Sequence, residues 1–434
     1  MLKTLKSDYL ARNRFLYIIE AAVEYFIYIL VTDAFLATLL TRNGVSDAAT
    51  GVISQLAALS FLAQLSSVIY KKTKGIKRWI TNMHVLNQLM FVSLYLIPLF
   101  GFPKWLSVVL FAVMLLGGNI ISNIISPFKY SYMMSFVPGN SRGTFTATKE
   151  IVSLITGMIF TFVMGAVVDY YHAVGKDNNG FFVCGITILT LSITHLAVML
   201  LIKDPNEDKT SENHGQKEYR INLLTSIKES FTDKIIVKLM LIDIIWNFGV
   251  GISIPFYGVY KINELGFSLK YVSILSIMYA ISRVTFSKYF GRYADKHSWS
   301  RLLIHSFIIA SAAFTINVFT VPSNGRWMFA IYYCIYAVSM AGINSGVINI
   351  IYDYVDKDKI HKALGIKYAA GGVSSFIASL IGGKILSEIQ NNGNKLFGIT
   401  VYAQQVLTFG ALIITITLII YLIKVINVMP KLKQ

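Results

Sequence analysis

The amino-acid sequence predicts an all-α integral membrane protein with twelve transmembrane helices arranged as two six-helix bundles. Of its 434 residues, 55% are hydrophobic and 14% are charged, whereas an ordinary soluble protein has about 45–50% apolar and about 25% charged residues. Apolar runs of about 20 residues, long enough to cross a bilayer, recur roughly every 30 to 40 positions. Basic residues gather in alternate links between these runs, as they do in cytoplasmic loops.

The apolar runs define the individual spans. The predicted transmembrane helices are residues 15–41, 47–70, 79–100, 105–134, 144–170, 181–202, 235–261, 268–290, 302–321, 327–352, 364–388 and 398–425. The first is expected to be a retained span rather than a signal peptide, because it is long, contains Glu20 and Glu24, and lacks a small-residue cleavage site.

The distribution of lysine and arginine predicts the orientation of the chain in the membrane. One set of links is rich in basic residues: Lys3, Lys6, Arg12, Arg14, Lys71, Lys72, Lys74, Lys77, Arg78, Arg142, Arg292, Lys296, Arg301, Lys357, Lys359, Lys362, Lys431 and Lys433. The opposite set contains little beyond Arg42, Lys104, Lys176, Lys270, Arg326 and Lys395. We therefore expect both termini in the cytoplasm and the protein in the plasma (inner) membrane. Loops that face an anionic leaflet explain the net charge of +17 without a nucleic-acid partner.

The longest polar segment divides the spans into two sets of six. We expect a cytoplasmic N-terminus at 1–14, an N-terminal bundle at 15–202, a linker with an amphipathic helix at 203–234, a C-terminal bundle at 235–425 and a cytoplasmic tail at 426–434. Residues 146–168 align without gaps to 364–386, with Lys149 on Lys367. This match favours two parallel repeats, although chance similarity between apolar helices is the alternative.

The link between the second and third helices of the second half is unusually charged for so apolar a chain. It reads FGRYADKHSWSR (290–301) and contains Gly291, Asp295 and Arg301. With this motif, a long central linker and six spans on either side of it, the sequence resembles the major facilitator superfamily. The first-half counterpart, VIYKKTKGIKRW (68–79), departs from the family motif because it lacks the glycine and the acid.

The resemblance implies secondary transport by alternating access and a latch on the cytoplasmic side. In the family the acid of the motif caps a helix of the opposite half, which here would join Asp295 to the start of the fifth helix at Arg142. A carboxylate near a helix N-terminus gains about 0.3–1 kcal/mol, a suitable size for a latch that must open. The alternative is a loop that only fixes topology. The gating candidates in these links are Arg142, Gly291, Asp295 and Arg301.

Three carboxylates lie in the first predicted helix, at Glu20, Glu24 and Asp33. An ionisable group at mid-helix costs at least about 2.5–3.5 kcal/mol, so such groups tend to be functional. Glu20 and Glu24 lie one helical turn apart and could bind and release a proton or a cation. A static salt bridge, with Lys149 or Lys367 as the partner, is the alternative. Asp33 would contact solvent or form an outer gate.

Polar side chains form stripes on the fourth, seventh and tenth predicted helices. These helices and the first line the central cavity in the superfamily that the sequence resembles. The predicted substrate-cavity residues are Tyr28, Asn119, Asn123, Asp243, Trp246, Asn247, Arg283, Asn344 and Asn349. Arg283 would bind an anionic substrate or pair with Asp243. Each stripe could instead hold neighbouring helices together.

The seventh predicted helix contains residues that weaken its hydrogen-bond ladder. Pro255 lies among Gly249, Gly251 and Gly258, so we expect a bendable helix with Pro255 as a gating residue. A static kink is the alternative.

Several function classes are not indicated by the sequence. It has no phosphate-binding loop, metal-ligand cluster or nucleophile elbow, so we expect no enzyme activity, catalytic residue, cofactor or metal. His84, His195 and His305 are expected to be packed or interfacial. The predicted function is secondary active transport of a small organic solute, with protons as the coupling ion, by a monomer in the bilayer. The alternatives are an efflux antiporter for a drug or lipid-like molecule and a transporter-like sensor without flux. No motif specifies the substrate, the direction or the coupling ion.

Overall fold

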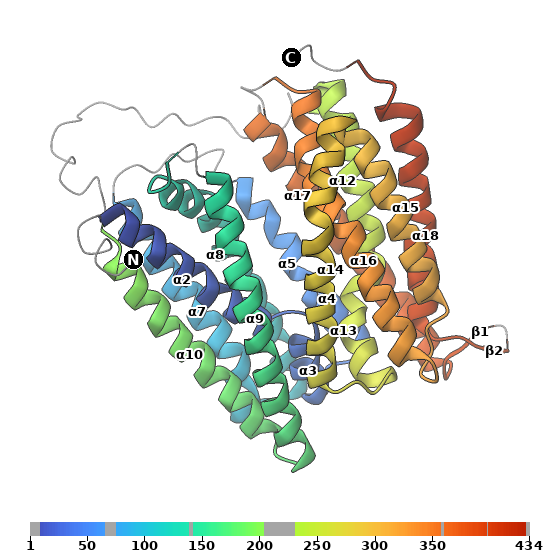
Figure 1. Cartoon of the computed structure of the whole chain (residues 1–434). Coiled ribbons are helices and arrows are strands. Elements are labelled where there is room, and N and C mark those ends of the chain that lie inside the picture. Colours follow the sequence, from blue (N-terminus) through green and yellow to red (C-terminus); the bar gives the residue numbers. More distant parts are fainter. Residues whose placement is uncertain are drawn as a thin grey trace. The chain divides into compact units, whose positions relative to one another are not determined.

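The computed structural model describes residues 9–65, 75–138, 142–203, 231–356, 360–396 and 398–430. Within these ranges, twelve helical segments are long and apolar enough to cross a membrane, and each overlaps one predicted span. The α-helices (Figure 1) are α2 (Tyr9–Leu30), α3 (Asp33–Arg42), α4 (Asp47–Ser54), α5 (Leu56–Leu59), α7 (Ile76–Leu96), α8 (Lys104–Met134), α9 (Arg142–Ala173), α10 (Asp177–Leu201), α12 (Lys234–Ser253), α13 (Tyr257–Val259), α14 (Leu269–Lys296), α15 (Trp299–Val318), α16 (Gly325–Asn349), α17 (Ile360–Asn391) and α18 (Ala403–Tyr421). The predicted helical membrane fold is confirmed, and the orientation of the termini stays a prediction.

Contacts group the chain into two units. The first comprises residues 1–39 and 63–221, and the second comprises residues 40–62 and 222–434. The helices α4 and α5, which form the second predicted span, therefore group with the C-terminal half and contact α17. The division into bundles at 15–202 and 235–425 remains a prediction from the sequence.

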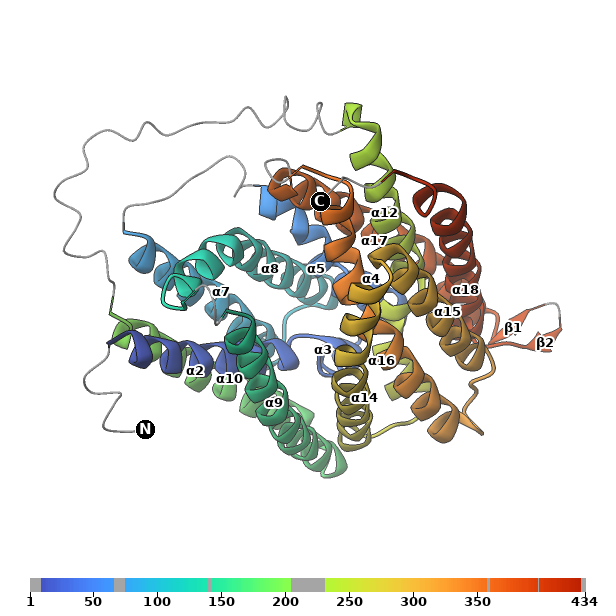
Figure 2. The same cartoon turned by 45° about the horizontal axis from the view of Figure 1, so that its top comes forward.

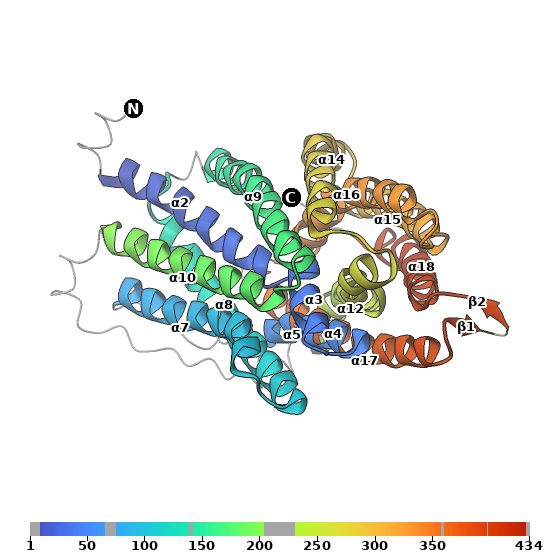
Figure 3. The ribbon, with the colours of Figure 1, turned by 90° about the horizontal axis from the view of Figure 1, so that it is seen from below.

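The first unit is built around α2, which contacts both α9 and α10 (Figure 3), while α7 contacts α8 and α10. Apolar side chains from α2, α7, α8 and α10 meet in one buried cluster. Its members are Leu16, Tyr17, Ile80, Ile125, Tyr132, Met133, Phe136, Val198, Met199 and Ile202. This packing fixes the helices whose polar side chains form the site described below.

The first span contains a break that the sequence did not predict. The helix α2 ends at Leu30 and α3 begins at Asp33, whose φ of 46° is unusual for a residue other than glycine. Thr32 follows the end of α2 and donates its hydroxyl proton to the Tyr28 carbonyl at 2.8 Å. Asp33 thus begins a new helix rather than continuing the first.

The second unit packs α12 against α17 and α18, and α15 against α16 and α18 (Figure 2). The contact between α12 and α17 is close because small residues face each other. A Cβ atom on Gly251 would stand 2.4 Å from the carbonyl oxygen of Ser375, so only glycine fits there. This close contact holds α12 beside the helix that carries Lys367.

The seventh span changes its helical geometry at the proline that the sequence singles out. After α12 ends at Ser253, the chain forms a 3₁₀ turn at Ile254–Phe256 that contains Pro255, then α13, and then a π-helical turn at Tyr260–Glu264. Proline lacks the backbone donor that a continuous helix needs, which accounts for the change of geometry. The helical geometry changes at Pro255, while the choice between a bendable helix and a static kink, and the gating role of Pro255, stay predictions.

The predicted twelfth span begins too early. Residues Lys395–Leu396 (β1) and Ile399–Thr400 (β2) pair as antiparallel strands, with Lys395 opposite Thr400, and α18 begins only at Ala403. Gly393, Asn394 and Gly398 have positive φ angles that suit turns rather than helix. The predicted span, which starts at residue 398, therefore wrongly includes the second strand of this short hairpin.

Candidate functional site

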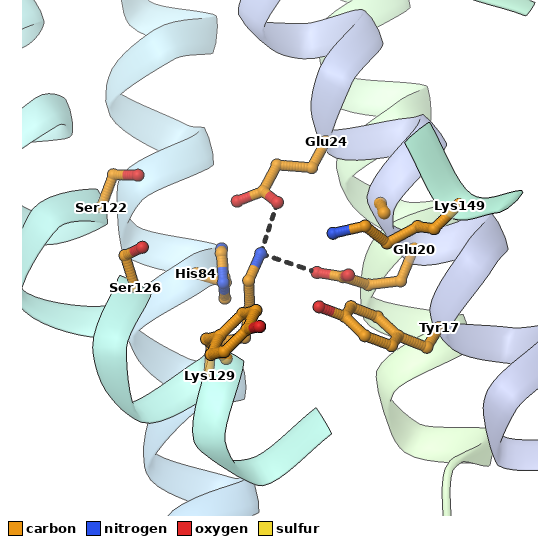
Figure 4. Close-up of a pocket in the computed structure, with 10 residues that line it drawn as sticks. Tyr17, Glu20, Glu24, His84, Ser122, Ser126, Lys129 and Lys149 are labelled. Carbon is orange, nitrogen blue, oxygen red and sulfur yellow. Dashed lines mark hydrogen bonds and ion pairs between the residues drawn. The ribbon is translucent and has the colours of Figure 1, made fainter. Parts of the chain in front are cut away.

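A cavity of about 190 Å³ lies within the first unit, among α2, α7, α8 and α9 (Figure 4). Most of its lining residues carry a charge, a hydroxyl group or an imidazole ring. They are Tyr17, Glu20, Ala21, Glu24, His84, Ser122, Ser126, Lys129, Tyr130 and Lys149. So many polar groups inside a chain of apolar helices mark this cavity as the candidate site.

Lys129 on α8 joins the two carboxylates of α2. Its Nζ atom donates a hydrogen bond to Glu20 Oε1 at 3.0 Å and a second to Glu24 Oε2 (Figure 4). The Glu20 side chain is fully buried, that of Lys129 is 11% exposed and that of Glu24 is 37% exposed. One ammonium group therefore connects a deep carboxylate to one that faces accessible space.

Two histidines surround the deep carboxylate. His195 on α10 has its Nε2 atom 2.9 Å from Glu20 Oε1, and the ring of His84 on α7 lies 4.8 Å from the ring of His195. Both histidines are buried, as the sequence led us to expect. The contact of His195 with Glu20, and the closeness of the two imidazole rings, place both histidines in the polar cluster.

Lys149 on α9 is held differently from Lys129. Its Nζ atom lies 5.1 Å from the centre of the Tyr17 ring, a cation–π arrangement. Among the described residues, the ion-pair partner of Glu20 and Glu24 is Lys129, and neither carboxylate is within ion-pair distance of Lys149. The predicted alternative of a salt bridge from Lys149 to the first helix is therefore corrected to Lys129.

A second buried ion pair lies in the second unit. Lys367 Nζ on α17 lies 3.1 Å from Asp243 Oδ2 on α12, and both side chains are 2% exposed. Lys367 also donates to the Val347 carbonyl. The predicted pairing of Asp243 with Arg283 is wrong, because Lys367 takes that place across the close contact between α12 and α17.

The asparagines of the predicted polar stripes form hydrogen bonds mainly within their own helices. The side-chain amides of Asn119, Asn123, Asn247 and Asn349 each donate to the carbonyl four residues earlier, at 2.8–3.0 Å. None of these residues lines the cavity of the first unit, whereas Ser122 and Ser126 do. Asn344 is half-buried on α16 and does not line that cavity either.

Two of the predicted cavity residues, Trp246 and Tyr28, are aromatic, and they differ in burial. Trp246 is buried, with its ring 4.9 Å from that of Phe307, and Tyr257 lies 5.6 Å from Tyr332 in a cluster of rings. Tyr28 is 53% exposed and is absent from the cavity lining. The predicted role of Tyr28 in a central substrate cavity stays a prediction.

The gating candidates are only partly described. Arg301 donates its backbone N–H to Ser298 Oγ at 3.2 Å, which caps α15, and a side chain at Gly291 would meet open space. The side chains of Arg142 and Asp295 lie outside the described part of the chain. The latch between these two residues stays a prediction.

Three site residues were missed by the sequence: Lys129, His84 and His195. Lys129 lies three residues after Ser126 and continues the polar face of the fourth helix, so extending that stripe by one step would have found it. No sequence pattern could have linked the two histidines to Glu20. The three residues come from three helices that are distant in the sequence.

Twelve apolar helices in the described part of the chain, with ionisable groups paired inside them, indicate a multi-pass membrane protein. The family model "Major Facilitator Superfamily" matches residues 89–379 and 239–431, and the chain belongs to that superfamily.

Solved structures of the same fold cover almost the whole chain. A nucleoside transporter, NupG, matches at 12% identity with a TM-score of 0.69, covering 95% of this chain and 98% of that one. A D-xylose–proton symporter matches at 14% identity with a TM-score of 0.68, covering 93% and 96% of the two chains. The inward-open xylose transporter XylE from E. coli matches at 13% identity with a TM-score of 0.66, covering 96% of each. No curated protein sequence gives a significant match.

Proposed function

We propose that this protein is a proton-coupled secondary transporter that moves a small polar solute by alternating access, with Glu24 as the proton-carrying residue. The observation that carries the proposal is the single ammonium group of Lys129 shared between Glu20 and Glu24 at the wall of a cavity. The membership of the superfamily and the solved nucleoside and xylose–proton transporters of the same fold support it.

The difference in exposure between the two carboxylates assigns their roles. Solvent can reach Glu24, whose side chain is 37% exposed, but not Glu20, whose side chain is fully buried. A proton that arrives through the cavity therefore meets Glu24 first. Once Glu24 is neutral, Lys129 keeps its bond to Glu20 and has a hydrogen-bond donor available for a solute.

The charges of the cavity favour an anionic or zwitterionic solute. Lys129 and Lys149 balance Glu20 and Glu24, so a proton on Glu24 leaves one positive charge in excess. A negative group on the solute would restore the balance, because an uncompensated charge inside the membrane is unfavourable. Proton and solute would thus stabilise each other in the cavity and cross together.

The size of the cavity favours a small solute. Its volume of about 190 Å³ is below the range of about 300–1,000 Å³ typical of sites that enclose drug-sized ligands. This favours uptake or release of a small metabolite over efflux of a drug or lipid-like molecule. We also propose that the transporter works as a monomer in the plasma (inner) membrane, with the basic loops on the cytoplasmic side.

The test is transport by purified protein in proteoliposomes, with and without an imposed pH gradient. Labelled monocarboxylates, amino acids, nucleosides and sugars would be screened first. Glu24→Gln should abolish accumulation driven by the pH gradient while solute exchange across the membrane continues. The matched control is Glu150→Gln, which removes an exposed carboxylate on α9 and should leave accumulation unchanged.

Each alternative has its own outcome in this assay. Normal gradient-driven accumulation by Glu24→Gln would refute the role of Glu24. Transport only of lipophilic cations would favour an efflux antiporter, and no flux of any solute by well-folded protein would favour a sensor.

A further inference from the structure

Three side chains with metal-binding groups meet beside the cavity of the first unit. Glu20, His84 and His195 come from α2, α7 and α10, and one ligand atom of each lies within 4.8 Å of the others. Their exposed fractions are 0%, 2% and 1%. A carboxylate and two imidazoles therefore lie close together in a buried position. Exposed clusters of charged groups are common on protein surfaces, but this cluster is not one of them.

Several of these atoms have no partner in the described part of the chain. Glu20 Oε2 and both ring nitrogens of His84 are buried there without a hydrogen bond. Most buried polar groups in proteins are hydrogen-bonded, since leaving them unpaired is unfavourable. Packing explains why the imidazole is buried, but not why both of its nitrogen atoms are directed at no protein group. The unpartnered atoms point to a ligand at this position.

We propose that Glu20, His84 and His195 form a binding site for a divalent transition-metal ion of the Zn²⁺ and Co²⁺ type. Two imidazoles with one carboxylate suit these ions, whereas Ca²⁺ and Mg²⁺ prefer oxygen ligands alone. Glu20 and His84 also line the cavity, so a water molecule or a solute group in the cavity can complete the coordination. This inference goes beyond the proposed transport function and does not depend on it.

The distances require only a modest rearrangement. Ligand atoms bound to a tetrahedral ion at about 2.0–2.2 Å lie about 3.4 Å from each other. The widest separation in the cluster is within 4.8 Å, so the three groups must approach by at most about 1.4 Å. Side-chain rotation can supply this movement, because each ligand comes from a different helix and turns independently.

Lys129 competes with the metal ion for Glu20. Its Nζ atom lies 3.0 Å from Glu20 Oε1, and a dication next to it would repel the ammonium group. Lys129 also bonds to Glu24, which can retain it when the metal ion takes Glu20. Metal binding would therefore move Lys129 towards Glu24 and would connect this site to the charges of the cavity.

The experiment measures metal binding directly on the full-length protein in detergent, after removal of any histidine tag and of bound metal by chelation. Co²⁺ would be titrated while its visible absorption is recorded, and Zn²⁺ would then be added to displace it. We expect one equivalent of Co²⁺ with a spectrum typical of nitrogen and oxygen ligands. His84→Gln, His195→Gln and Glu20→Gln should each weaken binding by at least about tenfold.

Two further variants keep the test specific. His305→Ala removes a histidine on α15 in the other unit and should bind Co²⁺ as the wild type does. Lys129→Met removes the competing ammonium group and should tighten binding. Each variant would first be checked for a monodisperse elution profile and a cooperative thermal transition, so that a misfolded sample is not mistaken for a lost ligand.

The results that would overturn the proposal are equally direct. Substoichiometric binding by folded wild-type protein would exclude the site. Equal loss of binding in His305→Ala and His84→Gln would assign the metal to non-specific surface binding. Unchanged or weaker binding in Lys129→Met would refute the competition with Lys129.

Discussion

The buried ion pair between Asp243 and Lys367 gives a prediction whose size follows from the structure. Their charged atoms are 3.1 Å apart, and each side chain is only 2% exposed. Two unit charges at this separation attract each other by about 5 kcal/mol at an effective dielectric constant of about 20. Removing one partner leaves the other charge buried without compensation, which typically costs about 3–5 kcal/mol. Asp243→Asn and Lys367→Met should each lower the free energy of unfolding by that amount.

The double variant separates the attraction from the cost of burying the charges. Asp243→Asn combined with Lys367→Met leaves no uncompensated charge, so its free energy of unfolding should return to within about 2 kcal/mol of the wild type. The assay is unfolding in mixed detergent micelles, followed by tryptophan fluorescence, with a double-mutant cycle to give the coupling energy.

Arg283→Met is the matched control, because the sequence offered Arg283 as the alternative partner of Asp243. It should change stability far less than Lys367→Met does. The reasoning would be refuted if Arg283→Met were as destabilising as Lys367→Met, or if the double variant were no more stable than the single ones.

Other predictions concern packing and orientation. Gly251→Ala should destabilise the protein by about 1–3 kcal/mol, because its Cβ atom would stand 2.4 Å from the Ser375 carbonyl oxygen. Gly291→Ala, which lies within α14 and whose Cβ meets open space, should be neutral or slightly stabilising. Equal thermal stability of the two variants would contradict the close contact between α12 and α17. In a cysteine-free background, Arg292→Cys should react with a membrane-impermeant reagent from the cytoplasmic side and Lys104→Cys from the opposite side. Labelling of both from one side would refute the predicted topology.

Much of the fold could be predicted because the bilayer imposes a simple rule. A helix that crosses it needs about 20 apolar residues, and this requirement identified all twelve spans. The same requirement does not predict where the backbone changes conformation within a span. The break before Asp33 has no glycine or proline at Val31 or Thr32 to signal it, whereas the break at Pro255 could be predicted from the missing backbone donor.

Of the charged groups that form the candidate site, the sequence predicted the two carboxylates but not the lysine that pairs with them. Glu20 and Glu24 were found because an ionisable group inside a membrane helix is unfavourable and therefore conspicuous. Their partner could not be chosen, because Lys129 and Lys149 are both lysines in predicted helices and only tertiary packing decides which one reaches α2. The same limit explains why Arg283 was considered for Asp243 instead of Lys367.

Lys149 and Lys367 occupy matching positions in the two halves of the sequence but have different partners. The two lysines align in sequence, yet Lys367 is neutralised by Asp243 while Lys149 rests on the ring of Tyr17 and Lys129 has taken over the acidic partners. Each half therefore neutralises a buried carboxylate with a lysine from a different position of its bundle, α8 in the first unit and α17 in the second. Lys149, at the position that matches Lys367, keeps its charge beside the cavity without an ion pair to Glu20 or Glu24.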